Sequence, residues 1–241
     1  GTGPFESTSN VYFCSILGMI PEMIMYRDGP HTVHLVDYRP PEFLIDRVDL
    51  LFELDADATG VEAAIVVRRN PASPRGDGSL TLHGEQLVLE RVALDGRELP
   101  PSEYRRDDES LIIHRVPDRF VLETRVRIGP AANTTLEGLY QSGPLLCTQC
   151  EAEGFRRITY FLDRPDVMAR FSTTIIAPKE RYPVLLSNGN PVEARELGGG
   201  RHLARWEDPF PKPSYLFALV AGDLHLVEDR FVTASGRDVA L

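Results

Sequence analysis

The sequence predicts an all-β fold, built as a sandwich or as curved open sheets. Hydrophobic and polar side chains alternate with a period of two in many short segments, of which residues 120–128 are the clearest. Turn-forming residues separate these segments at regular intervals, as in sandwiches and barrels. Helical signal is nearly absent. Only residues 163–170 could form one or two helical turns, since Asp163 could cap them and Pro165 could occupy the first turn.

The first expected strands form a hairpin. Residues 43–54 alternate, and the irregular step between Ile45 and Val48 indicates a bulge or a strand start. Residues 61–67 resume the alternation, which makes them the expected partner strand. A loop rich in Pro, Gly and Ser follows at residues 70–79.

Later strands are separated by recognisable turns. Asp95-Gly96 and Asn188-Gly189 are typical of tight hairpin turns, because both positions of such turns favour residues that tolerate positive φ. The three glycines 198–200 mark another connection. The remaining expected strands are 79–83, 86–94, 111–114, 120–128, 171–177, 184–187, 202–206, 214–221 and 224–233.

Length and charge limit the classes of function. The chain has 241 residues, enough for one large all-β domain or two small ones with a sizeable core. Its formal net charge is -10, and its basic residues are scattered, so its surface would repel a phosphate backbone. We therefore expect no nucleic-acid partner.

The cysteines and the amino-terminal segment bear on localisation. Three cysteines are an odd number and too few for a disulfide scaffold, so a reducing cytoplasm is expected. The longest apolar run, residues 11–20, is too short to span a bilayer, and no membrane span is expected. No basic stretch precedes this run, which argues against a signal peptide. Residues 1–35 are expected to be a disordered leader or remnant rather than a targeting segment.

No catalytic motif is recognisable from the residues alone. None of the six histidines lies in a His-Glu-x-x-His arrangement, and neither Gly-x-Ser-x-Gly nor a phosphate-binding glycine loop occurs. Cys147 and Cys150 form a lone C-x-x-C pair, which could be half of a zinc site or a redox pair. A structural zinc needs two more ligands, and none follows at usable spacing. Two packed thiols are the default interpretation, with no catalytic or metal site in this chain.

The middle of the chain carries a specific resemblance. Residues 133–143, 147–160 and 163–167 closely resemble bacterial aminopeptidase N of the M1 family of zinc metallopeptidases, and the likeness continues through 186–190, 206–213 and 215–222. Upstream it begins near residue 36. The resemblance implies that residues 36–241 form the family's amino-terminal domain, a saddle-like all-β unit with at most one short helix.

The resemblance also implies what is missing. The family's catalytic domain carries Gly-x-Met-Glu-Asn and His-Glu-x-x-His, and neither occurs in this sequence. The chain is then expected to end where the catalytic domain would begin and to be inactive alone. Zinc would belong to the parent enzyme's catalytic domain, which removes single residues from peptide amino termini. The expected partners are that domain and, through the parent enzyme, the peptide substrate.

One functional loop falls inside the chain. By resemblance, the loop at residues 148–151 reaches into the parent enzyme's active site, where Glu151 binds the substrate's α-ammonium group and Gln149 lines the pocket for the first side chain. A carboxylate suits this task because an ammonium group leaving water needs a charge-assisted acceptor. Arg156 and Asp163 are expected to hold the loop rather than to touch substrate.

Two other interpretations remain open. The chain could be a free-standing, non-catalytic β-sandwich interaction module, or, less plausibly, a metal-binding module built on Cys147 and Cys150. An interaction module predicts a polar surface all round. A domain that belongs with a partner predicts an exposed apolar face around residues 208–221.

Overall fold

The computed structural model describes residues 34–240 and confirms the all-β class, with 52% strand, 6% helix and no helix of seven residues or more. The chain divides into two compact units, Gly1–Tyr38 and Arg39–Leu241. Most of the predicted leader, residues 1–33, lies outside the described residues. The described part of the first unit contains one 3-10 helix, η1 (Leu35–Asp37).

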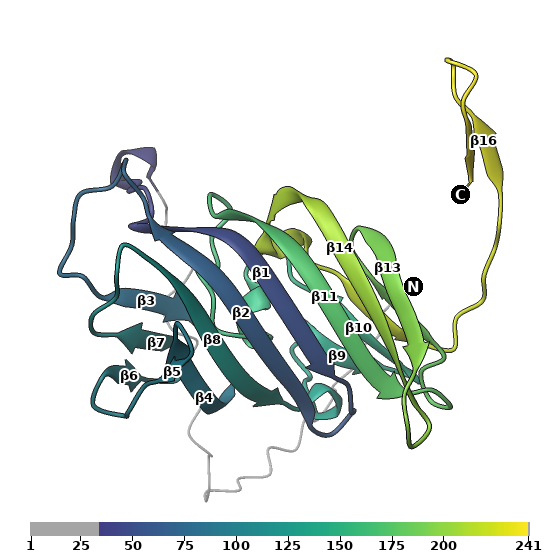
Figure 1. Cartoon of the computed structure of the whole chain (residues 1–241), viewed down its shortest axis with the longest axis horizontal. Coiled ribbons are helices and arrows are strands. Elements are labelled where there is room, and N and C mark those ends of the chain that lie inside the picture. The colour runs from purple at the N-terminus through teal and green to yellow at the C-terminus, as the bar shows by residue number, and fades with distance from the viewer. Residues whose placement is uncertain (1–33, 241) are drawn as a thin grey trace, which may run out of the picture. The chain divides into compact units, whose positions relative to one another are not determined.

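The second unit is built on an eight-stranded sheet (Figure 1). Its strands pair antiparallel except for one parallel pair, β1 with β11, which joins segments more than a hundred residues apart. In spatial order the strands are β13 (Asn190–Glu196), β14 (Arg201–Pro213), β11 (Met168–Pro178), β1 (Phe43–Glu53), β2 (Thr59–Arg69), β8 (Arg119–Ile128), β4 (Val88–Leu94) and β5 (Arg97–Glu98).

Smaller sheets complete the unit. A four-stranded sheet has the order β12 (Val184–Ser187), β15 (Leu219–Gly222), β10 (Leu145–Gln149) and β9 (Gly138–Ser142). A three-stranded sheet has the order β3 (Leu80–His83), β7 (Ser110–Ile113) and β6 (Tyr104–Arg106). The strands β16 (Arg230–Val232) and β17 (Asp238–Ala240) pair only with each other. Three short 3-10 helices connect strands: η2 (Pro130–Ala132), η3 (Gly154–Arg157) and η4 (Ser214–Leu216).

One hydrophobic core joins the sheets. Along β1 the buried side chains Val48, Leu50 and Phe52 alternate with partly exposed ones, as the period-two pattern predicts. They belong to the same buried cluster as Leu146 of β10 and Leu219 of β15. The large and four-stranded sheets therefore share a core, as in a β-sandwich.

Two local predictions are confirmed. The pairing of β1 with β2 shifts register between Ile45 and Arg47, where the sequence indicated a bulge or a strand start. At the hairpin between β4 and β5, Asp95 has φ 49° and Gly96 has φ 79°. Positive φ at both central residues is the signature of the type I′ turn that Asp-Gly favours.

Other local predictions are wrong. Residues 163–170 form no helix. They contain a turn at 165–166 and then enter β11. The carboxylate of Asp163 is buried and bound to Arg156 and Ser214, so it does not cap a helix. Of the strand expected at 224–233, only β16 forms.

The strand β14 runs farther than the sequence suggested, through the proline-rich residues 209–213. The register between β11 and β14 shifts between Ala169 and Phe171, opposite this stretch. Arg170 donates from Nε to the carbonyl oxygen of Pro209 at 3.0 Å. The irregularity lets the sheet tolerate residues that cannot donate backbone hydrogen bonds.

Candidate functional site

The predicted substrate-binding residues lie where β10 ends. Gln149 is the last residue of β10, and Glu151 follows the buried Cys150. The Glu151–Ala152 peptide bond is cis. The side-chain amide of Gln149 donates to the carbonyl oxygen of Glu151 at 3.1 Å, and Glu151 itself is exposed. Within residues 34–240, no hydrogen bond or ion pair engages the Glu151 carboxylate.

Close backbone packing fixes the loop after Glu151. The amide of Gly154 donates to the carbonyl oxygen of Cys150 at 2.9 Å. A Cβ atom on Gly154 would lie 2.5 Å from the carbonyl oxygen of Gln149 and 2.9 Å from the amide nitrogen of Gly138. No side chain larger than hydrogen fits there, because backbone atoms cannot move aside like a flexible side chain.

An aromatic anchor follows immediately. The ring of Phe155 is fully buried. Its centroid lies 4.8 Å from that of Phe161, 5.3 Å from that of Phe217 and 5.9 Å from that of Phe171, each in an edge-to-face arrangement. Such pairs add to the stabilisation from area burial. The loop that carries Glu151 is thus held in the common core.

Two consecutive arginines tie η3 to its surroundings. Arg157 pairs with Glu85 at 2.8 Å and with Glu137 at 3.1 Å. Arg156 donates from Nε to Oδ2 of Asp163 at 3.1 Å, and its backbone amide donates to the same oxygen at 3.2 Å. Both guanidinium groups are largely buried, so solvent screens these pairs less than surface ion pairs.

His83 also contacts Asp163. Its Nδ1 accepts a hydrogen bond from the backbone amide of Asp163 at 3.3 Å. Burial lowers the pKa of His83, and the positive charge of Arg156 lowers it further. Because Nδ1 is an acceptor in this bond, the neutral imidazole is the form that fits.

We expect His83 to make stability depend on pH. The unfolded chain takes up a proton near pH 6.5, whereas the folded chain resists it because the folded pKa of His83 is lowered. This contribution is therefore complete above about pH 6.5 and is lost as pH falls toward the folded pKa. Asparagine retains an acceptor but does not titrate, so His83→Asn should lose less of its melting temperature between pH 7.5 and 5.5. Equal losses in thermal unfolding of the two proteins would contradict this expectation.

Burial disfavours reactivity at one cysteine of the C-x-x-C pair. Cys147 and Cys150 are both free thiols, and burial strongly raises the pKa of Cys150, which disfavours the nucleophilic thiolate. In the part of the chain that the structure describes, no group of three or more His, Cys, Asp or Glu side chains could hold a metal ion. The described residues therefore do not fit zinc.

Comparison with known proteins decides the family. The model of the peptidase M1 N-terminal domain matches residues 46–216. The chain belongs to this family. Aminopeptidase N of Caulobacter vibrioides is 54% identical over 90% of the chain, and aminopeptidase N of Escherichia coli is 54% identical over 88%.

A solved structure agrees with this membership of the M1 family. Legionella pneumophila aminopeptidase A, crystallised with aspartic acid, has a TM-score of 0.81 and 38% identity over 86% of the chain. An M1 zinc metallopeptidase of Deinococcus radiodurans, at 14% identity and a TM-score of 0.68, shows the shared fold alone. The chain spans 25% and 24% of the two aminopeptidase N sequences, so it corresponds to about a quarter of such proteins.

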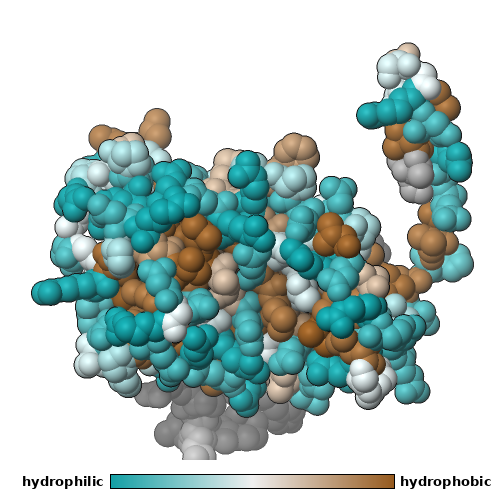
Figure 2. Space-filling view, in the orientation of Figure 1, coloured by the Kyte–Doolittle hydropathy of each residue, from teal (hydrophilic) through white to brown (hydrophobic). Residues whose placement is uncertain are grey.

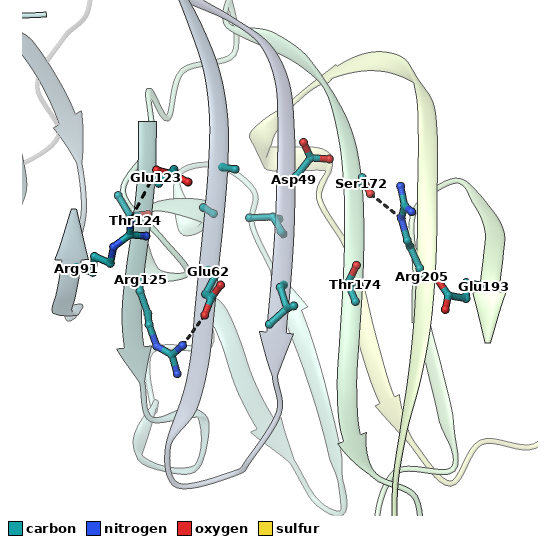
Figure 3. Close-up of a pocket in the computed structure, with 14 residues that line it drawn as sticks. Asp49, Glu62, Arg91, Glu123, Thr124, Arg125, Ser172, Thr174, Glu193 and Arg205 are labelled. Atoms are coloured by element: carbon teal, nitrogen blue, oxygen red, sulfur yellow. Dashed lines mark hydrogen bonds and ion pairs between the residues drawn. The ribbon is translucent and has the colours of Figure 1, made fainter. Parts of the chain in front are cut away.

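The outer face of the M1 domain's large sheet carries a depression (Figure 3). The face is mostly hydrophilic (Figure 2), and its charged side chains pair with one another. Arg125 pairs with Glu62, and Arg91 lies 3.8 Å from Glu123. Neither Gln149 nor Glu151 lines this depression. Charged side chains are expected on the solvent-exposed face of an antiparallel sheet. Their pairing here forms no catalytic arrangement.

The structure places Gln149 at the end of β10 and Glu151 in the loop that follows, so the expected loop at 148–151 begins inside the strand. Their binding of substrate stays a prediction. The structure also reveals contacts that the sequence analysis missed. His83 and Ser214 reach Asp163 across 80 and 51 residues of sequence. No local motif marks these positions, because the contacts depend on which sheets meet in the fold.

Among residues 34–240, no helix is long and apolar enough to cross a membrane.

Proposed function

We propose that this domain is the substrate-recognition part of a zinc-dependent aminopeptidase that removes single residues from peptide amino termini. The observation that carries the proposal is the state of Glu151. Its carboxylate is exposed and unengaged within the described residues, although the chain on both sides of it is fixed. A carboxylate that is held in place and has no partner within the described chain is suited to bind a ligand from outside it.

The chemistry of the external partner follows from the carboxylate. A peptide's α-ammonium group is cationic near neutral pH, and a carboxylate accepts charge-assisted hydrogen bonds from it. Gln149 lies beside Glu151 and would line the pocket for the first side chain. Fixing the amine relative to the reacting bond would restrict cleavage to one residue from the end.

Zinc and the hydrolytic groups would belong to the parent enzyme's catalytic domain, where zinc supplies the activated water. We infer that this chain alone is inactive, and that the parent enzyme is cytoplasmic. The two free thiols in the described chain suit a reducing compartment.

Exposed apolar side chains support a domain partner rather than a free-standing module. Phe210 is 75% exposed and Leu216 is 51% exposed, and both lie in the region where an apolar face was expected. Met168, at the start of β11, is 51% exposed and pairs with Pro213 of β14. An interaction module with a polar surface all round would not expose these apolar side chains.

The test compares the 241-residue chain with the full-length enzyme on an L-alanyl arylamide and on its N-acetylated form. We expect hydrolysis only by the full-length enzyme, only of the substrate with a free amine, and not after zinc chelation. Activity of the isolated chain would contradict the assignment of catalysis to another domain. Equal cleavage of the acetylated substrate would contradict amine recognition.

A further inference from the structure

Asp163 is a buried carboxylate that the proposed recognition step does not use directly. Its side chain is 1% exposed. Oδ2 accepts two hydrogen bonds from Arg156, one from the backbone amide and one from Nε. Oδ1 accepts a hydrogen bond from the hydroxyl of Ser214 at 2.6 Å. Both carboxylate oxygens are therefore satisfied without solvent.

These bonds join separate parts of the fold. Arg156 lies in η3, immediately after the loop that carries Glu151. Ser214 begins η4, directly after β14 of the large sheet. His83 ends β3 of the three-stranded sheet and accepts from the Asp163 amide. Asp163 thus links the loop to two other sheets.

We propose that Asp163 is a positioning residue for α-amine recognition, acting through Arg156 to fix the Glu151 carboxylate. This rests on the proposed function of Glu151. Arg156 is held by its backbone amide as well as by its guanidinium, so Asp163 fixes the main chain at η3. The hydrogen bond from the Gly154 amide to the Cys150 carbonyl oxygen joins the two ends of the segment that contains Glu151, so fixing η3 also fixes this segment.

A charge is needed at position 163 because its partner is also buried. The Arg156 side chain is only 14% exposed, and its two other carboxylate partners, Glu153 at 3.1 Å and Glu85 at 3.8 Å, are 65% and 27% exposed. An uncharged residue 163 would leave a buried guanidinium without its main counterion. The guanidinium would then turn toward solvent and displace η3, and the loop would move with it.

The experiment measures kcat and KM of the full-length enzyme on an L-alanyl arylamide for wild type, Asp163→Asn, Glu151→Gln and the double variant. We expect Asp163→Asn to raise KM about tenfold with kcat within about threefold, since small misplacements of binding groups are costly. In the Glu151→Gln background the same change should add less than about twofold, because residues that act through one another are not additive. Glu180→Gln removes an exposed carboxylate outside this network and is the control, which should leave both constants unchanged.

The outcomes separate the two proposals. Wild-type kinetics for Glu151→Gln would overturn the proposed function, and this inference with it. If Glu151→Gln impairs the enzyme, two results would overturn the positioning role alone. One is a wild-type KM for Asp163→Asn, and the other is an Asp163→Asn effect that is as large in the double variant as in the single variant.

A second variant covers the case in which Asp163→Asn does not fold. Ser214→Ala removes one hydrogen bond to Asp163 and keeps the ion pair, so KM should rise about threefold, as expected for one lost bond to a charged group. An unchanged KM would overturn the inference.

Discussion

Replacing Glu151 by Gln in the full-length enzyme should lower kcat/KM for free-amine substrates about a hundredfold, because a charge-assisted pair with a desolvated ammonium group is lost. The two side chains have nearly the same shape, so the change removes charge without leaving a hole. The loop itself should not change, since the Glu151 side chain forms no hydrogen bond or ion pair within the described chain. Steady-state kinetics on an L-alanyl arylamide measures the effect, and unchanged thermal unfolding confirms that the fold is intact.

Glu153→Gln provides the comparison two residues away. Glu153 is also an exposed carboxylate of this loop, but it pairs with Arg156 at 3.1 Å. A general loss of negative charge near the active site would affect both variants similarly. A specific α-amine contact would make Glu151→Gln far more damaging than Glu153→Gln, so equal kinetics of the two variants would argue against the assigned role.

Replacing Phe155 by Ala should destabilise the domain by about 4 kcal/mol, because it removes a fully buried ring and leaves a cavity. Three edge-to-face contacts, with Phe161, Phe171 and Phe217, disappear together. For a domain of this size, the melting temperature should fall by about 10 °C. Thermal unfolding followed by circular dichroism measures the shift.

The same substitution at Phe210 is the matched control. Its side chain is 75% exposed, so Phe210→Ala should change the melting temperature by no more than about 2 °C. A small effect at position 155 would mean that the aromatic cluster does not hold the loop in the core. That result would also weaken the argument that the chain around Glu151 is fixed.

The sequence was most informative where one face of a strand is buried and the other is not. The alternation in β1, β2 and β8 gave their positions closely, because a one-residue slip would turn every core side chain outward. The strand β13 was missed because all of its residues are exposed, so no alternation arises. The strands β9 and β10 were missed because they lie in a polar, glycine-containing stretch.

The site was less predictable than the fold. In composition and spacing, Glu151 resembles any solvated carboxylate, and only the likeness to the M1 family singled it out. Arg156 and Asp163 were expected to hold the loop, but their contacts with Ser214 and His83 could not be inferred, because these residues reach Asp163 only through the arrangement of separate sheets. Sequence patterns report burial along one element, whereas these contacts depend on how elements meet.

The outer face of the large sheet has a consequence for mutational tolerance. Arg125 is paired with Glu53, Glu62 and Glu90, so losing any one carboxylate leaves the guanidinium with two others. Such exposed pairs contribute little individually. Single substitutions of these carboxylates should therefore lower the stability of the domain only slightly. Arg156 also has two further carboxylates, those of Glu153 and Glu85, but only Asp163 accepts in addition from the Arg156 backbone amide and from the Ser214 hydroxyl. Substitutions at position 163 should therefore be tolerated less well than substitutions on the outer face.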